Sequence, residues 1–346
     1  MLGIRRPILQ APMAAAATPE LAVAVSAAGG LGALGSAVLP PDELRRQAEA
    51  VRAATEAPFN VNFFCHPPPQ IAPELAERAR ELLTPLYEEN GLGEPPAPSV
   101  APISFDQARL EATLEIRPPV VSFHFGLPAA PAVQAIRDAG SRVIASATTV
   151  EEAVRLEELG ADAVIAQGSE AGGHRGSFLV EGDDGPIGTL ALVPQVVDAV
   201  AVPVIAAGGI ADGRGLAAAL ALGAGAAQIG TAFLACPEAR VHPAHRAAIR
   251  EVAGEATTIT RAFSGRPARA VRNRVSDTVP DDQAIAFPAQ RSLTDPLAER
   301  GAEAADLMPM WLGQAAGLAS ERPAAELVES LVAEAERVLG ELSPRA

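Results

Sequence analysis

The stretch that decides the fold of this chain is the apolar run Ala163-Val164-Ile165-Ala166 followed directly by Gln167-Gly168-Ser169-Glu170-Ala171-Gly172-Gly173-His174-Arg175-Gly176. The apolar run predicts a short buried strand. The glycines that follow it let the backbone pass close to a ligand, because they have no side chain in the way. The same loop presents one imidazole, that of His174. We therefore predict an active-site loop at one rim of a sheet.

Two further apolar strands, each followed by glycine, come later in the chain. They are Val204-Ile205-Ala206-Ala207-Gly208-Gly209 and Ala227-Gln228-Ile229-Gly230-Thr231. In a (β/α)8 barrel the loops after strands 7 and 8 expose backbone N–H groups, and glycine lets a phosphate approach them. A single glycine pair is more often only a tight turn. Two such turns one βα unit apart, preceded by the His174 loop, predict a phosphate site in a barrel.

The rest of the chain alternates strand and helix signals, which is typical of a parallel sheet. The strands predicted up to the His174 loop are residues 8–13, 31–37, 59–64, 120–125, 142–147 and 163–166. The spacing breaks after residue 64, in a proline-rich stretch that we interpret as an insertion. We predict a TIM barrel from residues 1–64 and 119–255, accessory segments 65–118 and 256–322 that form one cap, and a C-terminal helix over 323–346. The acidic residues 177–189 are predicted to form a lid loop.

The composition limits the partners of this protein. The net charge of −15 argues against binding to nucleic acid or to an anionic membrane. All 27 basic residues are arginine, and the absence of lysine excludes Schiff-base aldolases, pyridoxal enzymes and Walker-type nucleotide sites. The N-terminus lacks the apolar segment of a signal peptide, and no long uncharged apolar stretch predicts a membrane span, so we expect a cytoplasmic protein.

The cysteines and histidines give few metal-ligating combinations. Cys65 and Cys236 are far apart and form no CxxC, so we expect buried thiols and no disulfide or metal pair. No group of histidine and acidic residues has metal spacing. His174 follows two glycines at the predicted rim and is the residue that we expect to perform chemistry. His124, at the end of a predicted strand, is a second candidate that could contact substrate. The remaining histidines, His66, His242 and His245, are expected on the surface or in loops.

Six motifs in barrel order carry a family resemblance that covers nearly the whole chain. They are Gln10-Ala11-Pro12-Met13, Asn60-Val61-Asn62-Phe63, Gln167 to Gly176, Val204 to Gly209, Gln228 to Thr231 and Thr260 to Arg269. Together they resemble the nitronate monooxygenases of the bacterial class I type, formerly called 2-nitropropane dioxygenases. The resemblance implies a TIM barrel that holds FMN without a covalent bond. It also implies oxidation of alkyl nitronates, such as propionate 3-nitronate, by O2 to a carbonyl compound and nitrite, a detoxifying reaction.

The resemblance also implies which residues contact the flavin. They are Pro12, Met13, Asn62, Gln167, Gly172, Gly208, Gly209, Gln228, Ile229, Gly230 and Thr231. For His174 it implies either a base that takes the α-proton of a nitroalkane or a donor to the nitro oxygens of a nitronate, and the family's preference for nitronates favours the donor. One departure is the run Ala14 to Ala17, where relatives carry a glycine. If the turn needs a positive φ there, alanine strains it.

Two other functions remain open. An FMN-dependent NAD(P)H reductase of the enoyl-acyl-carrier-protein or quinone type would share the barrel and its glycine loops, but the segment Thr260 to Arg269 looks like the monooxygenase version. A flavin-binding barrel without turnover is disfavoured by His174. The sequence leaves the physiological nitronate undecided and a homodimer open.

Overall fold

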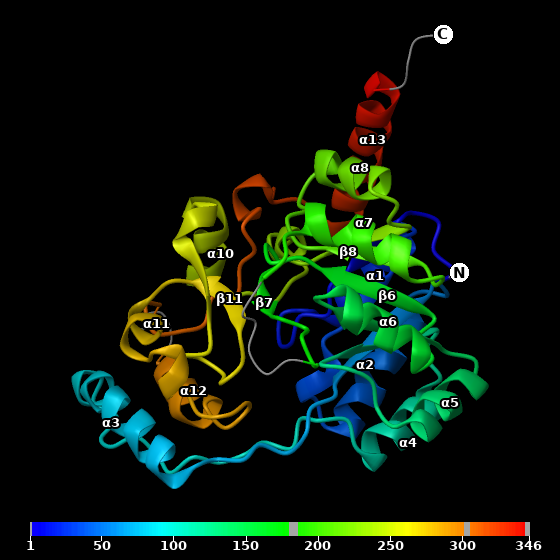
Figure 1. The fold of residues 1–346 in the computed structure, drawn as a ribbon. Helices are drawn as coiled ribbons and strands as arrows, with labels where there is room; N and C mark the ends of the chain where they lie inside the picture. Colours follow the sequence, from blue (N-terminus) through cyan, green and yellow to red (C-terminus); the bar gives the residue numbers. More distant parts are fainter. Residues whose placement is uncertain (1, 180–185, 301–304, 343–346) are drawn as a thin grey trace.

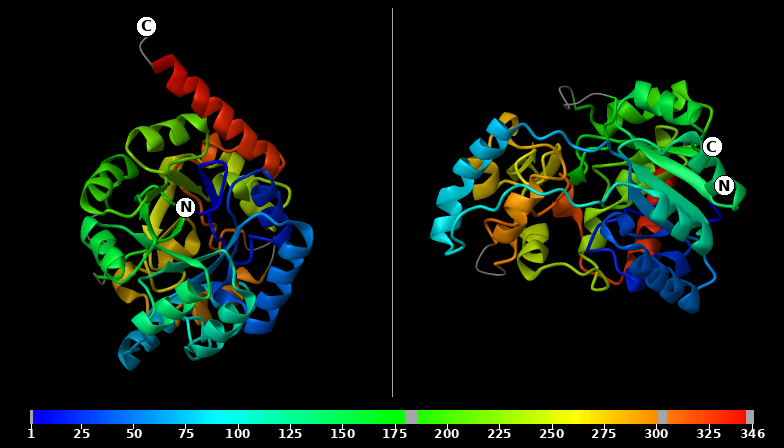
Figure 2. Two further views of the ribbon diagram at one scale, coloured as in Figure 1. Left: turned by 90° about the vertical axis from the view of Figure 1, so that its right-hand side faces the viewer. Right: turned by 90° about the horizontal axis from the view of Figure 1, so that it is seen from below.

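The computed structural model describes residues 2–179, 186–300 and 305–342. Eight parallel strands form a barrel with helices around its outside (Figures 1 and 2), which confirms the predicted TIM-barrel class. The sheet order is β1-β9-β8-β6-β5-β4-β3-β2, and a parallel bridge between Leu9 and Leu31 joins its two edges. The barrel strands are β1 (Ile8–Gln10), β2 (Gly32–Leu34), β3 (Phe59–Phe64), β4 (Val120–His124), β5 (Arg142–Ala147), β6 (Ala163–Gln167), β8 (Val204–Ala207) and β9 (Ala226–Ile229).

The seam between β1 and β2 is closed by two backbone hydrogen bonds, both to Leu31, and by one side chain, that of Gln10. Gln10 is only 1% exposed; its Nε2 donates to the carbonyl of Ala33 at 2.9 Å, and its Oε1 accepts from the N–H of Ala33 at 3.1 Å. The two bonds satisfy both backbone groups of Ala33, as a neighbouring strand would. The backbone N–H of Gln10 adds a bond to the Leu31 carbonyl at 2.9 Å. A glutamine at this position therefore replaces ladder hydrogen bonds where the barrel closes.

A ring of helices covers the barrel and buries the outward-facing strand residues in one core. The sequence starts several of them with capping residues: the Thr18, Thr149 and Asp212 side chains each accept a backbone N–H in the first turn of the following helix. In the described part of the chain, no helix is long and apolar enough to cross a membrane. The ring helices are α1 (Pro19–Ala27), α2 (Pro41–Ala54), α4 (Gln107–Ile116), α5 (Ala130–Asp138), α6 (Val150–Glu158), α7 (Thr189–Ala199), α8 (Gly213–Ala221) and α13 (Ala324–Leu342).

A second unit lies beyond the carboxyl ends of the barrel strands (Figure 1). It contains α3 (Pro73–Glu89), α10 (Pro243–Glu251), α11 (Arg274–Thr278), α12 (Arg291–Ala298) and an antiparallel sheet of β10 (Thr257–Thr260), β11 (Ala268–Val271) and β7 (Gly173–His174). Its core joins Leu83 and Tyr87 of α3 to Phe263 and Leu293 from the later segment. The predicted cap, built from the insertion and the C-terminal extension together, is thereby confirmed.

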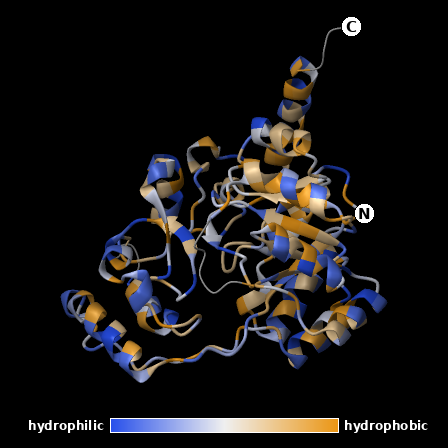
Figure 3. Ribbon diagram, in the orientation of Figure 1, coloured by the Kyte–Doolittle hydropathy of each residue, from blue (hydrophilic) through white to orange (hydrophobic). Residues whose placement is uncertain are grey.

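The domain boundaries stay a prediction, and the helix contacts indicate where they would fall. In the segment 65–118, α3 packs on α11 and α12, whereas α4 packs between α2 and α5 in the ring. The α13 helix packs on α8 and α1 and so occupies the remaining place in the ring. It carries hydrophobic and hydrophilic residues along its length (Figure 3). Of the predicted lid 177–189, residues 180–185 lie outside the described residues.

We predict that Gln10→Leu destabilises the barrel through its seam. Leucine fills a similar volume but leaves the N–H and the C=O of Ala33 without partners, at about 1–3 kcal/mol for each group. Urea unfolding should show a clear loss of free energy of unfolding. Gln134→Leu is the matched control, because Gln134 is exposed on α5 and bonds only to the side chain of Asp138. An equal effect of both substitutions would contradict this account of the seam.

Candidate active site

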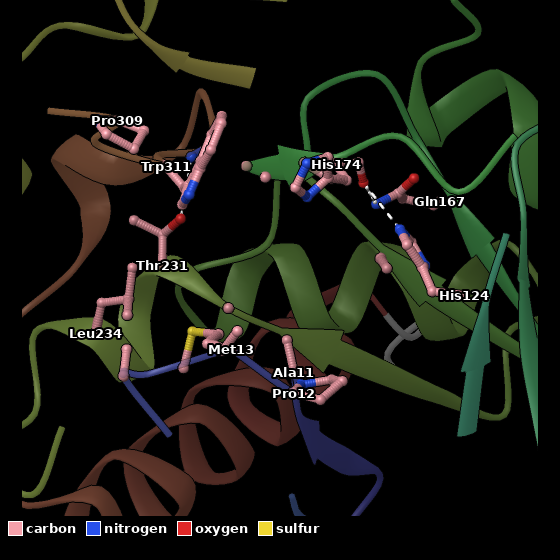
Figure 4. Close-up of a pocket in the computed structure, with 18 of the residues that line it drawn as sticks. Ala11, Pro12, Met13, His124, Gln167, His174, Thr231, Leu234, Pro309 and Trp311 are labelled. Atoms are coloured by element: carbon pink, nitrogen blue, oxygen red, sulfur yellow. Dashed lines mark hydrogen bonds between the residues drawn. The ribbon is translucent and has the colours of Figure 1, made fainter. Parts of the chain in front are cut away.

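A cavity of about 450 Å³ lies at the carboxyl ends of the barrel strands, under the second unit. Every residue predicted from the sequence to bind cofactor or substrate lines it, except Ile229, whose side chain is packed in the core between strands and helices. Figure 4 shows Ala11, Pro12 and Met13 on one side of the cavity and His174 and Trp311 on the other. The lining residues from the prediction are Pro12, Met13, Asn62, His124, Gln167, Gly172, His174, Gly208, Gly209, Gln228, Gly230 and Thr231.

One end of the cavity is made of backbone N–H groups. Gly208 and Gly209 have φ values of 106° and 71°, in the region that favours glycine. A Cβ on Gly208 would lie 3.0 Å from the backbone nitrogen of Ala171. Within the described residues, the N–H groups of Gly208, Gly209, Gly230 and Thr231 have no hydrogen-bond partner. Converging free N–H groups of this kind suit a phosphate.

Three side-chain amides face the same cavity with different hydrogen-bond states. Gln167 uses both ends: its Nε2 donates to the His174 carbonyl at 2.9 Å, and its Oε1 accepts from the N–H of Gly176 at 2.7 Å. Asn62 donates through Nδ2 to the hydroxyl of Ser122 at 3.0 Å. The Oε1 of Gln228 is buried and has no partner among the described residues. A buried amide oxygen without a donor is costly, so Gln228 is a ready acceptor for a ligand N–H.

The backbone carbonyl of His174 is held from two barrel strands. Besides Gln167 at the end of β6, the ring of His124 at the end of β4 contacts it, with Nε2 at 3.0 Å (Figure 4). Since a carbonyl can only accept, Nε2 of His124 must carry the proton. Burial lowers the pKa of His124 to about 4, so the ring is neutral. The structure thus gives His124 a positioning contact, and its predicted contact with substrate stays a prediction.

The imidazole of His174 lies among aromatic rings. The centroids of Phe64, Phe125, Phe287 and Trp311 are between 5.3 and 6.2 Å from its own. Burial, followed by the neighbouring His124 and two arginine charges, lowers the pKa of His174 to about 3. The ring is therefore neutral at physiological pH and a weak base.

Ser264 is the polar partner of that imidazole. Its hydroxyl lies 2.9 Å from Nε2 of His174 and 3.3 Å from the carbonyl of Arg266. The hydroxyl has one hydrogen to give. When it donates to Nε2, the ring's own hydrogen is on Nδ1; when it donates to the Arg266 carbonyl, Nε2 carries that hydrogen. Ser264 can therefore select which nitrogen of the neutral ring is the donor.

The segment Thr260 to Arg269 connects β10 to β11 and covers the site. The guanidinium of Arg266 stacks on Phe125, 3.9 Å from the ring centroid, and donates to the Ser177 carbonyl. The Nε of Arg269 donates to the Ser169 carbonyl at 2.9 Å. The sequence resemblance marked this segment, but no local pattern predicted that its arginines would hold the cavity loops.

His245 was expected on the surface or in a loop, and this prediction is wrong. It lies within α10 and lines the cavity, with Nε2 3.3 Å from the carbonyl of Trp311. Burial lowers its pKa to about 4. The ring centroids of Trp311 and His174 are 5.3 Å apart, so His245 supports the wall that carries both side chains. Its position follows from the fold of the second unit, which no periodic pattern in the sequence predicted.

Two features of the loops have structural explanations. Both carboxylate oxygens of Glu170 accept from Thr189 at the start of α7, so this acid caps a helix. Ala15, in the run where relatives carry glycine, has a φ of 63° and lines the cavity. An alanine in this region costs about 1–2 kcal/mol. Among the described residues, no three His, Cys, Asp or Glu side chains are grouped to hold a metal ion, and Cys65 and Cys236 are free.

Comparison with known proteins gives one consistent family. The family description "Nitronate monooxygenase" matches residues 1–334. Proteins named nitronate monooxygenase are 44% identical in Paraburkholderia phytofirmans, over 99% of this chain and 95% of that protein, and 45% identical in Pseudomonas aeruginosa, over 96% and 97%. A nitroalkane oxidase structure from Streptomyces ansochromogenes superposes with a TM-score of 0.91 at 41% identity over 99% of both chains. The FabK structure from Thermotoga maritima gives 0.76 at 33% identity, over 99% of this chain and 96% of that one. The chain therefore belongs to the nitronate monooxygenase family.

Proposed function

We propose that this protein uses FMN to oxidise alkyl nitronates with O2, yielding a carbonyl compound and nitrite, and that it does so in the cytoplasm. Family membership supports a flavin-dependent enzyme of nitronate oxidation. The observation that carries the finer proposal is the cavity itself. It combines a cradle of unpartnered N–H groups with a neutral, aromatic-enclosed imidazole.

The cavity residues fit a flavin mononucleotide. Gly208, Gly209, Gly230 and Thr231 would hold its phosphate, because their N–H groups lack partners in the described part of the chain. The unpartnered Oε1 of Gln228, together with Asn62, Gln167, Gly172 and the run Pro12-Met13, would contact the ring system. When bound, the flavin would accept electrons from the nitronate and react with O2.

His174 would act as a hydrogen-bond donor to the negative nitro oxygens. A ring with a pKa near 3 is a poor acceptor for the α-proton of a nitroalkane, because a general base works best with a pKa near the operating pH. A neutral N–H group in a water-poor aromatic enclosure is instead an effective donor to an anion. The hydroxyl of Ser264 supports this role by donating to Nε2 and leaving the hydrogen on Nδ1.

A reductase is the second candidate function. The glycine loops Gly172-Gly173 and Gly208-Gly209, which the sequence resemblance extends to such reductases, favour it. It would share the barrel and the cavity and use NAD(P)H as the electron donor. The likeness to a nitroalkane oxidase structure, at a TM-score of 0.91, favours the proposed oxidation.

We predict that the purified protein contains FMN and no FAD. The N–H cradle accommodates one phosphate, and the one GxGxxG match of the sequence, Gly30 to Gly35, spans the buried strand β2 and so forms no turn after a strand for a pyrophosphate. Mass analysis of the acid-released cofactor tests this expectation. Recovery of FAD would overturn the site assignment.

Gly208→Val should remove most of the flavin, because a Cβ there lies 3.0 Å from the Ala171 nitrogen and 3.1 Å from the Gly168 carbonyl oxygen, so the turn that presents the cradle N–H groups must shift. Gly140→Val is its matched control. Gly140 has a φ of 96° and an equally strained backbone, but it lies on the outside of the barrel and a Cβ there meets nothing within 4 Å.

We predict that a nitronate reduces the flavin much faster than NADPH does under anaerobic conditions. The turns that line the cavity contain no glycine-rich fingerprint that would bind the pyrophosphate of a dinucleotide. Stopped-flow absorbance with each reductant at micromolar concentration measures both rates in the same preparation. Rapid bleaching by NADPH would instead favour the reductase.

We predict that His174→Ala keeps the flavin and loses turnover. The imidazole is not part of the N–H cradle, so cofactor binding should persist. Loss of one oxyanion-type donor costs about 10²–10³ in rate. Steady-state rates on nitroethane and on its preformed nitronate, with flavin content measured by absorbance, test the role. A loss confined to nitroethane would make His174 a base, and unchanged rates on both would remove it from the mechanism.

A further inference from the structure

The cavity contains one charged pair that the proposed function does not use. Arg291 and Asp295 lie one turn apart at the start of α12, and both line the cavity. The Nη2 of Arg291 is 3.0 Å from Oδ2 of Asp295, and its Nε is 3.4 Å from Oδ1. The two side chains are 40% and 41% exposed, so a molecule in the cavity can reach them.

The surroundings make this pair the distinctive polar feature near the imidazole. The neighbouring wall is aromatic, formed by Phe64, Phe287 and Trp311 around His174. In the described lining, the other acidic side chain is Glu170, whose two oxygens are already bonded to Thr189. The charge of Arg291 is the smallest of the four causes that lower the pKa of His174.

This arrangement treats two kinds of anion differently. The guanidinium fork of Arg291 matches a carboxylate, but the carboxylate of Asp295 already occupies two of its N–H groups. A substrate carboxylate that binds Arg291 must displace Asp295 and also meets its negative charge. A nitronate with an alkyl tail meets neither obstacle, and its tail can pack on the aromatic wall. Like-charge placement of this kind is a known way to reject a competing ligand.

We propose that the Arg291–Asp295 pair determines substrate specificity. Because Asp295 already bonds to the guanidinium of Arg291, the cavity favours nitronates with uncharged tails over nitronates that carry a carboxylate. The inference rests on the proposed function and names its substrate class. Asp295 and Arg291 act here through the tail of the substrate and take no part in the oxidation itself.

A pair of matched substrates tests the proposal. Propyl 1-nitronate and propionate 3-nitronate differ by a methyl group in place of a carboxylate. The ratio of kcat/KM for the second over the first should rise about tenfold in Asp295→Asn, the change that corresponds to about 1.4 kcal/mol. In the double variant Arg291→Gln/Asp295→Asn the ratio should fall back, because the freed guanidinium is gone. Asp277→Asn is the charge-matched control, since Asp277 pairs with Arg272 on the exposed face of the second unit and does not line the cavity.

Binding gives a second readout that does not depend on turnover. Trp311 is the single tryptophan of the chain and lines the cavity, so its fluorescence reports occupancy. Titration with propionate should give a Kd about tenfold lower in Asp295→Asn than in the wild type, with propionamide as the neutral comparison. Loss of an i,i+4 pair on α12 costs only about 0.5 kcal/mol, so the variants should fold.

The outcomes separate the two proposals. An unchanged substrate ratio and an unchanged propionate Kd in Asp295→Asn would overturn the role of the pair, as would a gain that persists in the double variant. If the wild type oxidises neither nitronate, the proposed function fails. The fluorescence titration then still decides whether Asp295 keeps carboxylates from Arg291.

Discussion

The site depends on how one backbone carbonyl is held. The carbonyl of His174 accepts from Gln167 on β6 and from His124 on β4, while the same residue pairs with Ala268 of β11. Two barrel strands and the small antiparallel sheet are thereby joined at a single residue. Because β7 follows β6 in the chain and belongs to that sheet, the two hydrogen bonds to the His174 carbonyl hold the second unit over the strand ends. The cavity exists between the two units because this contact holds them in register.

The burial of His174 also determines which chemistry is available to its imidazole. The enclosure that positions His174 removes water from it and makes the charged form costly. His124, which is also neutral, contacts the backbone carbonyl of His174, and His245 contacts the backbone carbonyl of Trp311. His124, His174 and His245 thus line the cavity and hydrogen-bond without titrating near neutral pH. Such an interior favours steady polar contacts with an anion over proton transfer.

The sequence predicted the barrel and its glycine turns because these depend on local chemistry. Apolar runs, capping residues and glycines at strand ends mark βα units wherever they occur. The family resemblance then named the flavin-contacting residues, and all of these except Ile229 line the cavity. The second unit depends on contacts between distant segments. The sequence Gly173-His174 contains no signal that it pairs with residues 268 and 269. The sequence of α4 likewise contains none that marks it, and not α3, as a ring helix. His245 and Ser264 reach the cavity only through these long-range pairings, so a local pattern could not assign them.

The packing of α13 against both α8 and α1 has a consequence for how the protein is made. Translation proceeds from the N-terminus, so α1 leaves the ribosome long before α13 has been synthesised. Throughout that interval the apolar surface that α13 later covers on α1 has no partner, and such surfaces are prone to aggregation. In this topology the ring of helices around the barrel can close only after α13, its last member, has been synthesised.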